Sequence, residues 1–385
     1  MKKKILFIIS NMESGGVSKS MSSLLNIIDA QKYQVDVFIT NPTGVFMELI
    51  PSSVNLITNN KTQLLFSRFP RNLMLLLTQG YLFSFFIRLI AALLMLINKG
   101  YGGWLLSRML FKIKTKYNLA VDYNGQHQLY YLVDFIKADK KVSFFHSDYA
   151  QWDYYFKLDK RYYSKLDALF TISDICVASL NKFFPTIKEK TYKMENVSSL
   201  ALIEKLSKIK SDDIYDNSII SVGHLCEAKG TSLAIDVAIE LKKRGLDFKW
   251  YFLGKNTKEK DYQKIINDNE LQDVIILLGL KVNPYAIIRK SKILVHLSKF
   301  EGKSIALDEA KILEKPILVT NFSTVNDQFE NGINATICEF DKNEIANGII
   351  ELFGNETLRN KYSSNLKEQK IDNSIEIEKL YNLIP

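Results

Sequence analysis

The chain has 385 residues, of which 47% are hydrophobic and 24% are charged, and its formal net charge is +9. This length suits two domains better than one core, and the composition is that of a folded globular enzyme, which excludes a disordered chain. Cys176, Cys226 and Cys338 are too far apart for a metal-binding or redox motif. We expect them to be packing residues in a reducing cytoplasm.

The N-terminus predicts a buried parallel strand and no secretion signal. Residues 5–9 are apolar, a run too short for the core of a signal peptide. Gly15 and Gly16 follow, and a helical pattern then covers residues 18–28. A glycine pair between a first strand and its helix lets a ligand approach the backbone, although a plain turn is the alternative. The complete G-x-G-x-x-G dinucleotide motif is absent.

Strands alternate with helices through the rest of the N-terminal half. They are expected over residues 34–40, 54–57, 119–123, 142–145 and 168–172. This alternation predicts a doubly wound α/β domain with a parallel sheet. His146 follows the fourth of these strands, where a side chain points into the ligand crevice, although a lone His is often structural. Asp148 and Tyr149, just after it, are weaker candidates for contact with a ligand.

A basic and apolar insert, residues 61–116, interrupts the alternation. Residues 49–121 contain no Asp or Glu but nine Lys or Arg residues. Residues 73–97 are almost wholly apolar, yet Arg88 near their middle argues against a membrane-spanning helix. We expect these helices to lie on the inner membrane surface, where anionic lipids attract Lys and Arg. The alternative is that they complete the domain core, and nucleic acid is disfavoured because the charges interrupt apolar helices.

A second domain is expected after a polar hinge at residues 205–217. Its strands are predicted over residues 218–222, 248–253, 274–278, 293–297, 316–320 and 335–338. His224 and Lys229 lie in the loop after the first of these strands, and Leu280 follows the third. The predicted organisation is an N-terminal domain over 1–205, a C-terminal domain over 218–365, and a helix over 366–385 that returns to the first domain.

The stretch over residues 300–311 predicts an anion site between a strand and a helix. Gly302 lets the backbone approach a ligand where the helix begins. The helix dipole and three free N–H groups face that point: those of Lys303, Ser304 and Ile305. Glu301 and Glu309 flank it, and carboxylates accept hydrogen bonds from the vicinal hydroxyl groups of sugars. The alternative is an ordinary amphipathic helix with solvated charged faces.

These patterns together resemble the GT-B retaining glycosyltransferases of glycosyltransferase family four, also called glycosyl transferases group 1. The resemblance rests on Glu301-x7-Glu309, on the segment 221–230 and on the Gly15-Gly16 pair. It implies two Rossmann-like domains with a cleft between them. In that family the first Glu contacts the donor sugar and the second contacts the nucleotide ribose. The glycine pair is expected near the donor phosphates and the acceptor.

The resemblance also assigns roles to single residues. It implies that Lys229 neutralises the leaving diphosphate, that His146 lies beside the donor sugar and the acceptor, and that the turn at Leu280 meets the nucleobase. Asp148 and Tyr149, close to His146 in the sequence, are then the weaker candidates for contact with the acceptor. His224 is a departure, because the family has an Arg at this position. A neutral imidazole donates one hydrogen bond and carries no full charge, so His224 is protonated beside the phosphates, or another cation replaces it, or turnover is weaker.

The resemblance implies retaining transfer of a hexose-type sugar from a nucleotide sugar, expected to be a UDP-sugar. The acceptor is expected to be lipid-linked or a glycan, as in cell-envelope or capsular polysaccharide synthesis, with the protein on the cytoplasmic side of the membrane. No Asp-x-Asp occurs, so we expect neither a metal nor another cofactor. A kinase or ATPase is disfavoured because Leu297 replaces the first P-loop glycine. A nucleotide-sugar epimerase of the same fold and a non-catalytic membrane adaptor with a nucleotide pocket remain alternatives.

Overall fold

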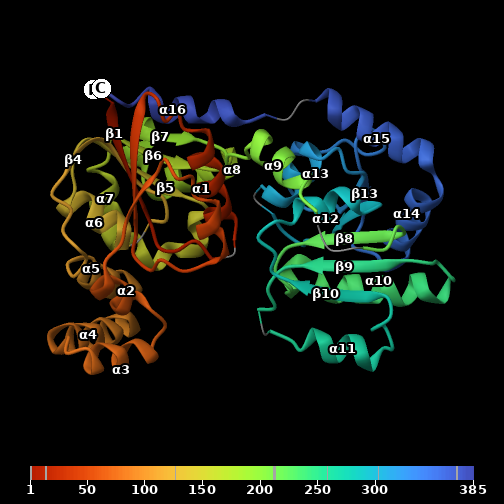
Figure 1. The fold of residues 1–385 in the computed structure, drawn as a ribbon, viewed down its shortest axis with the longest axis horizontal. Helices are drawn as coiled ribbons and strands as arrows, with labels where there is room; N and C mark the ends of the chain where they lie inside the picture. Colours follow the sequence, from red (N-terminus) through yellow and green to blue (C-terminus); the bar gives the residue numbers. More distant parts are fainter. Residues whose placement is uncertain are drawn as a thin grey trace. The chain divides into compact units, whose positions relative to one another are not determined.

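A computed structural model of the chain describes residues 2–13, 15–125, 127–210, 214–257, 259–301, 303–369 and 372–385. Its internal contacts divide it into two units, Met1–Val197 with Ser374–Pro385, and Ser198–Asn373. Each unit holds one sheet with helices packed around it (Figure 1). Within the expected hinge, residues 211–213 lie outside the described part of the chain.

The first unit is built on a sheet of seven strands in the order β3-β2-β1-β4-β5-β6-β7. The strands are β1 (Lys3–Ile9), β2 (Tyr33–Ile39), β3 (Asn55–Ile57), β4 (Lys116–Asp122), β5 (Lys137–Phe145), β6 (Ala168–Thr171) and β7 (Thr191–Lys193). All of these pairings are parallel. Alternate residues of β1 enter two separate cores, Phe7 on one face and Leu6 on the other, as expected of a parallel strand covered on both sides.

Helices cover both faces of this sheet and also form a separate group at one end of the unit. They are α1 (Gly16–Ile27), α2 (Asn60–Phe66), α3 (Arg71–Thr78), α4 (Leu82–Ile97), α5 (Lys99–Ser107), α6 (His127–Phe135), α7 (Phe156–Tyr163), α8 (Asp174–Phe183) and α16 (Glu378–Tyr381). Helices α2 to α5 form the insert and have a small core of their own, which includes Leu65, Leu76 and Ala91. Figure 1 shows α3 and α4 at the end of the unit, away from its sheet.

The second unit has a six-stranded sheet in the order β10-β9-β8-β11-β12-β13. Its strands are β8 (Ser218–Val222), β9 (Lys249–Leu253), β10 (Ile275–Gly279), β11 (Ile293–His296), β12 (Ile317–Thr320) and β13 (Thr336–Cys338). The pairings are again parallel. The helices are α9 (Leu200–Ser207), α10 (Thr231–Lys243), α11 (Tyr262–Asp268), α12 (Tyr285–Lys290), α13 (Ile305–Ile312), α14 (Lys342–Gly354) and α15 (Glu356–Glu368).

The strand order of each sheet reverses at one place. In the second unit the chain moves outward from β8 through β9 to β10, and then returns to the other side of β8 with β11. The loops that leave β8 and β11 therefore turn to opposite faces and open a crevice at the carboxyl ends of these two strands. In the first unit the same reversal lies between β1 and β4.

The C-terminal segment packs against the start of the first unit. The ring of Tyr381 stacks on Tyr33 with centroids 4.5 Å apart, and its hydroxyl oxygen accepts a hydrogen bond from the Asp29 amide at 3.1 Å. Lys3 donates to the Pro385 carbonyl at 2.5 Å. These contacts join the two ends of the chain within one unit.

Candidate functional site

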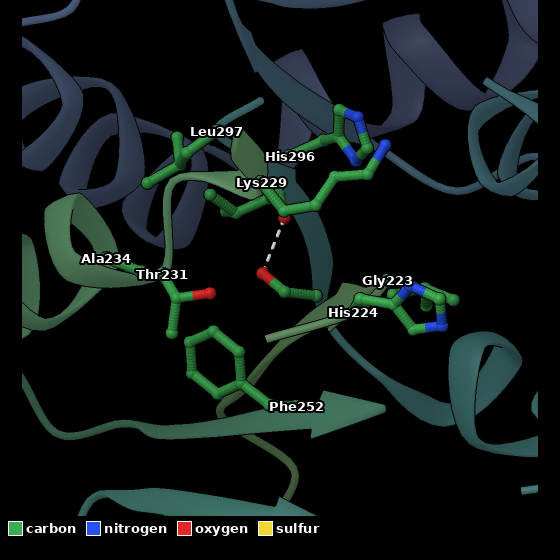
Figure 2. A pocket seen from close by; sticks show the side chains of 11 residues that line it. Gly223, His224, Lys229, Thr231, Ala234, Phe252, His296 and Leu297 are labelled. Atoms are coloured by element: carbon green, nitrogen blue, oxygen red, sulfur yellow. Dashed lines mark hydrogen bonds between the residues drawn. The ribbon is translucent and has the colours of Figure 1, made fainter. Parts of the chain in front are cut away.

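The loops after β8 and β11 form a pocket at the strand-order reversal of the second unit. The pocket encloses about 340 Å³, counting its opening to solvent. Most of its lining comes from these two strands and the loops that follow them, and α10 and β9 complete it: Ser221, Gly223, His224, Lys229, His296 and Leu297 are among its residues. The Ser221 hydroxyl group donates to the Val295 carbonyl at 2.6 Å and ties β8 to β11 beneath the pocket. In Figure 2 the side chains of Lys229 and His296 extend toward each other.

Glu301 is the centre of a cluster of hydrogen-bond donors. Its Oε1 atom accepts from the Ser298 hydroxyl group at 2.8 Å and lies 2.8 Å from Nε2 of His296. Lys229 also donates to Oε1, as an ion pair. Thr324 donates to the main-chain carbonyl of Glu301 at 2.9 Å and so fixes the backbone at this point. The structure therefore brings together Lys229 and Glu301, two predicted site residues that are 72 positions apart in the chain.

The cluster holds Glu301 in its ionised form. Burial raises the pKa of this carboxyl group, but the hydrogen bond from His296 and the electrostatic interactions with His296 and Lys229 outweigh burial, and the pKa is about 2. A carboxylate that is ionised at neutral pH is a hydrogen-bond acceptor only. It can therefore bind hydroxyl groups but not a phosphate.

A glycine allows Lys229 to reach this cluster. Gly230 has φ of +71°, in the left-handed region, and a Cβ atom there would lie 2.0 Å from the carbonyl oxygen of Leu297. The Lys299 amide donates to the Ala228 carbonyl at 2.9 Å, so the two loops also share a main-chain hydrogen bond. Only glycine permits this close approach of the two backbones.

We expect Gly230→Ala to lower the free energy of unfolding by about 2–5 kcal/mol, from left-handed strain and from the clash with Leu297 together. Gly245 is the matched control, because it has φ of +75° and a Cβ atom added there would have no other atom within 4 Å. Gly245→Ala should cost only about 1–2 kcal/mol, from backbone strain alone. Urea denaturation of both variants measures the difference, and equal losses would contradict the close approach at Gly230.

His224 lines the pocket and is in the position where the resembled family has an Arg. Burial lowers the pKa of its imidazole, and the nearby charges of Lys229 and Lys255 lower it further. Without ligand, His224 is therefore neutral at pH 7, and Lys229 is the cation that lines the pocket beside it. The first turn of α13 is a further source of positive potential.

Helix α13 begins at Ile305, with Ser304 as its N-cap. The Ser304 side chain makes no capping hydrogen bond, and the Leu307 amide donates to the Ser304 carbonyl at 3.2 Å. The amides of Ile305 and Ala306 precede this first helical hydrogen bond. Lys303 lies 3.9 Å from Asp308 in the first turn of the helix. Gly302, predicted to bring the backbone close to the ligand, lies outside the described residues.

Glu309 is placed differently from Glu301. It is 1% exposed, and its Oε1 accepts a hydrogen bond from the Tyr285 hydroxyl group at 2.7 Å. Burial and the charge of Glu309 raise the pKa of Tyr285, so the hydroxyl group keeps its proton and remains a donor. Leu280, predicted to lie near the nucleobase, is 37% exposed and directly follows β10. The roles of both residues stay predictions.

His146 and the glycine pair lie in the first unit. Gly15 is the N-cap of α1 with φ of +138°, and Gly16 begins the helix. Nδ1 of His146 lies 3.1 Å from the Asn196 side-chain oxygen, and its ring stacks on Phe144 with centroids 5.4 Å apart. Burial lowers the pKa of His146 to about 4, so the ring is neutral at pH 7. Its Nε2 atom is buried and has no hydrogen-bond partner in the described part of the structure.

The two predicted acceptor contacts are engaged within the first unit. Tyr149 is fully buried, and its hydroxyl group donates to Asp159 at 2.8 Å. This burial argues against a direct contact of Tyr149 with an acceptor. Asp148 accepts from the Ala150 amide at 3.0 Å and from the Ser179 hydroxyl group at 2.5 Å.

His296 and Ser298 are site residues that the sequence reasoning missed. His296 ends β11, and both side chains bind Glu301. A signal was present, because His296 follows the apolar residues 293–295 at the end of a strand, the same placement that pointed to His146. Ser298 carried no comparable signal.

Residues 203–369 match the protein family described as "Glycosyl transferases group 1". The poly(ribitol-phosphate) alpha-N-acetylglucosaminyltransferase of Staphylococcus aureus is 22% identical over 47% of this chain and 37% of its own length. The N-acetylgalactosamine-N,N'-diacetylbacillosaminyl-diphospho-undecaprenol 4-alpha-N-acetylgalactosaminyltransferase of Campylobacter jejuni is 27% identical over 45% of this chain and 46% of its own length. The chain thus matches less than half the length of these relatives.

Solved structures resemble the chain over almost its whole length. A crystal structure of a TarM variant from S. aureus with UDP and glycan ligands has a TM-score of 0.69 at 12% identity, covering 99% of both chains. Anabaena HepE with UDP-glucose has a TM-score of 0.68 at 15% identity, covering 98% of both chains. The predicted fold class, GT-B with two Rossmann-like domains, is confirmed.

Proposed function

Residues 203–369 are similar to the glycosyl transferases group 1, and on this similarity we propose that the chain transfers a sugar from a nucleotide sugar to an acceptor hydroxyl group. The observation that carries the proposal is the convergence of Lys229 and Glu301 at the carboxyl ends of β8 and β11. A nucleotide-sugar donor has a diphosphate and a sugar, and a cation beside a fixed carboxylate can bind both. The lysine suits the diphosphate and the carboxylate suits the hydroxyl groups of the sugar.

The donor we propose is a UDP-sugar with a hexose-type sugar. HepE was crystallised with UDP-glucose and the TarM variant with UDP, and both have the fold of this chain. Among the described residues, every hydrogen bond to the Glu301 carboxylate goes to Oε1, which leaves Oε2 for a sugar hydroxyl group. Lys229 would exchange its bond with Glu301 for one with the diphosphate when the donor binds.

We propose a retaining reaction without a protein nucleophile. The bond between the sugar's anomeric carbon and the diphosphate breaks, and the acceptor oxygen forms its bond on the same face. The departing phosphate oxygen takes the acceptor's proton, and nucleoside diphosphate leaves. The protein's main task is then to stabilise the negative charge that grows on the diphosphate. We assign this task to Lys229 and the first turn of α13, without a metal ion, and place His146 beside the reacting sugar.

The acceptor we propose is a glycan or a lipid-linked glycan of cell-surface polysaccharide synthesis. The names of the two relatives describe transfer to a ribitol-phosphate polymer and to a diphospho-undecaprenol-linked sugar. We place the enzyme at the cytoplasmic face of the cell membrane, held there by the insert of residues 61–116. The three cysteines are free and buried, as suits a reducing compartment.

The proposal predicts that UDP and one UDP-sugar raise the melting temperature of the chain. A ligand at about 100 times its Kd adds about 2.7 kcal/mol to the free energy of unfolding. We would screen UDP, GDP, ADP and a panel of their sugars by differential scanning fluorimetry, and then assay release of nucleoside diphosphate with and without an acceptor. Stabilisation by none of these nucleotides would contradict the proposal. Epimerised sugar without any acceptor would favour an epimerase instead.

A further inference from the structure

Helix α4 is apolar on both faces and exposes one of them. Its residues at spacings of three and four, Phe83, Phe86, Ile90, Leu93 and Ile97, lie on one face and are 46–77% exposed. The opposite face turns inward and carries the only polar residues of the helix, Ser84 and Arg88. Ser84 is 1% exposed, and the Arg88 guanidinium lies 5.2 Å from the centre of the Phe69 ring. A surface helix in water normally turns its apolar face to the core.

Helix α3 extends the same apolar surface. Met74 and Leu77 of α3 are exposed, as are Phe69 before it and Leu82 at the start of α4. Helices α3 and α4 pack on each other, and Figure 1 shows them together at the end of the first unit. The exposed apolar side chains of α3 and α4 therefore form one surface, which we call the α3–α4 face. Contiguous apolar surfaces of this kind mark interaction sites.

The charge around the α3–α4 face has one sign. Arg68, just before α3, and Arg71, its first residue, are exposed, and so is Lys99, the first residue of α5. Residues 49–121 contain no Asp or Glu at all. A second copy of the chain on this face would set these cations against identical cations, which is unfavourable. An apolar surface with negative charges at its rim complements both properties, and the surface of an anionic lipid bilayer has them.

The length of α4 defines how it can enter a bilayer. Its sixteen residues extend about 24 Å at 1.5 Å per residue, less than the ~30 Å of the hydrocarbon core. Within the described ranges of the chain, no helix combines the length and the hydropathy needed for a membrane span. The helix is suited to lie in the plane of the interface, with its outward side chains among the acyl chains.

We propose that the α3–α4 face inserts into the headgroup region of an anionic membrane, with Phe83, Phe86 and Leu93 as its principal anchors. Arg68, Arg71 and Lys99 then lie at the level of the lipid phosphates. The inference rests on the proposed function, because it supplies the surface on which a lipid-linked acceptor is presented to the enzyme. The proposed contact with the membrane is one face of two helices and not the whole insert.

Vesicle flotation of the full-length chain tests the proposal. The vesicles contain phosphatidylglycerol and phosphatidylcholine, or phosphatidylcholine alone. The triple variant Phe83→Ser, Phe86→Ser, Leu93→Ser should bind the anionic vesicles more than about tenfold more weakly, since it removes three large apolar anchors. Arg68→Gln and Arg71→Gln should each weaken binding about fivefold at low salt. Ile175→Ser is the matched control, because Ile175 is 56% exposed on α8 of the same unit, and it should bind as the wild type does.

All of the changed residues are exposed, so each variant should keep the wild-type melting temperature. Three results would overturn the proposal: no binding of the wild type at low salt, equal binding of the triple variant, or a dimer in solution that the triple variant abolishes. The thermal shift with UDP is measured on the same samples. Lost flotation with an intact UDP shift contradicts only membrane docking, whereas flotation without any UDP shift contradicts only the nucleotide-sugar proposal.

Discussion

Lys229→Met is expected to lower the rate of sugar transfer about a hundredfold to a thousandfold, the usual loss when one group that stabilises developing charge is removed. The methionine keeps most of the length of the side chain but removes the charge that this loop brings to Glu301. In the chain without ligand, burial keeps the pKa of His224 below its ordinary value, so His224 supplies no full charge there. The effect should fall mainly on kcat, since the charge on the leaving diphosphate grows in the transition state.

The matched control for Lys229 is Lys243→Met. Lys243 is an exposed lysine in the last turn of α10, the helix that follows Lys229. Both variants are assayed for release of nucleoside diphosphate, with circular dichroism to show that they are folded at the assay temperature. Lys243→Met should keep full activity. Wild-type turnover in Lys229→Met would show that the diphosphate is stabilised elsewhere.

Glu301→Gln is expected to lower kcat/KM about 10- to 100-fold, because a hydrogen bond to a charged group contributes about 1.5–3 kcal/mol. The amide has nearly the same shape, but its NH2 group cannot accept hydrogen bonds from Lys229, His296 or a sugar hydroxyl group. Glu351→Gln, at an exposed position on α14, is the matched control. Unchanged kinetics in Glu301→Gln would remove this carboxylate from the donor site.

The same carboxylate gives a pH dependence of stability. Its pKa of about 2 in the folded chain lies below the ordinary value of 4.5, so the unfolded chain binds more protons between these values. Glu301 therefore stabilises the fold fully above about pH 4.5, by about 3 kcal/mol, and this contribution is lost as the pH falls toward 2. In urea denaturation, Glu301→Gln should be less stable than wild type at pH 7, with the gap closing as the pH falls below 4.5.

The strands and helices were largely predictable because each has its own local pattern. The apolar runs at residues 5–9 and 293–297 predicted strands, and the structure has β1 and β11 there. Strand β7 was missed, because it has only three residues and the sequence Thr-Tyr-Lys has no buried alternation. Lys229 and Glu301 were predicted to share a site, and the structure shows that they are in contact.

What the sequence could not show was which side chains would pair. Tyr149, next to a candidate site in sequence, is buried on Asp159, and Glu309 binds Tyr285 from another helix. These partners lie on elements that only the packing of the fold brings together. The spacing of residues along the sequence therefore does not predict them. In α4 both faces are largely apolar, and a pattern alone cannot tell which face is outward. In the structure the polar side chain of Ser84 faces inward, although polar residues of a surface helix usually face solvent.

We propose that the pocket between β8 and β11 binds the diphosphate of a nucleotide sugar. A crystal structure of the chain with UDP tests it most directly. We expect the two phosphoryl groups to lie within hydrogen-bond distance of Lys229 and of the main-chain N–H groups of residues 303–305, with the contact between Lys229 and Glu301 broken. UDP bound elsewhere, with that ion pair intact and the pocket unoccupied, would contradict it.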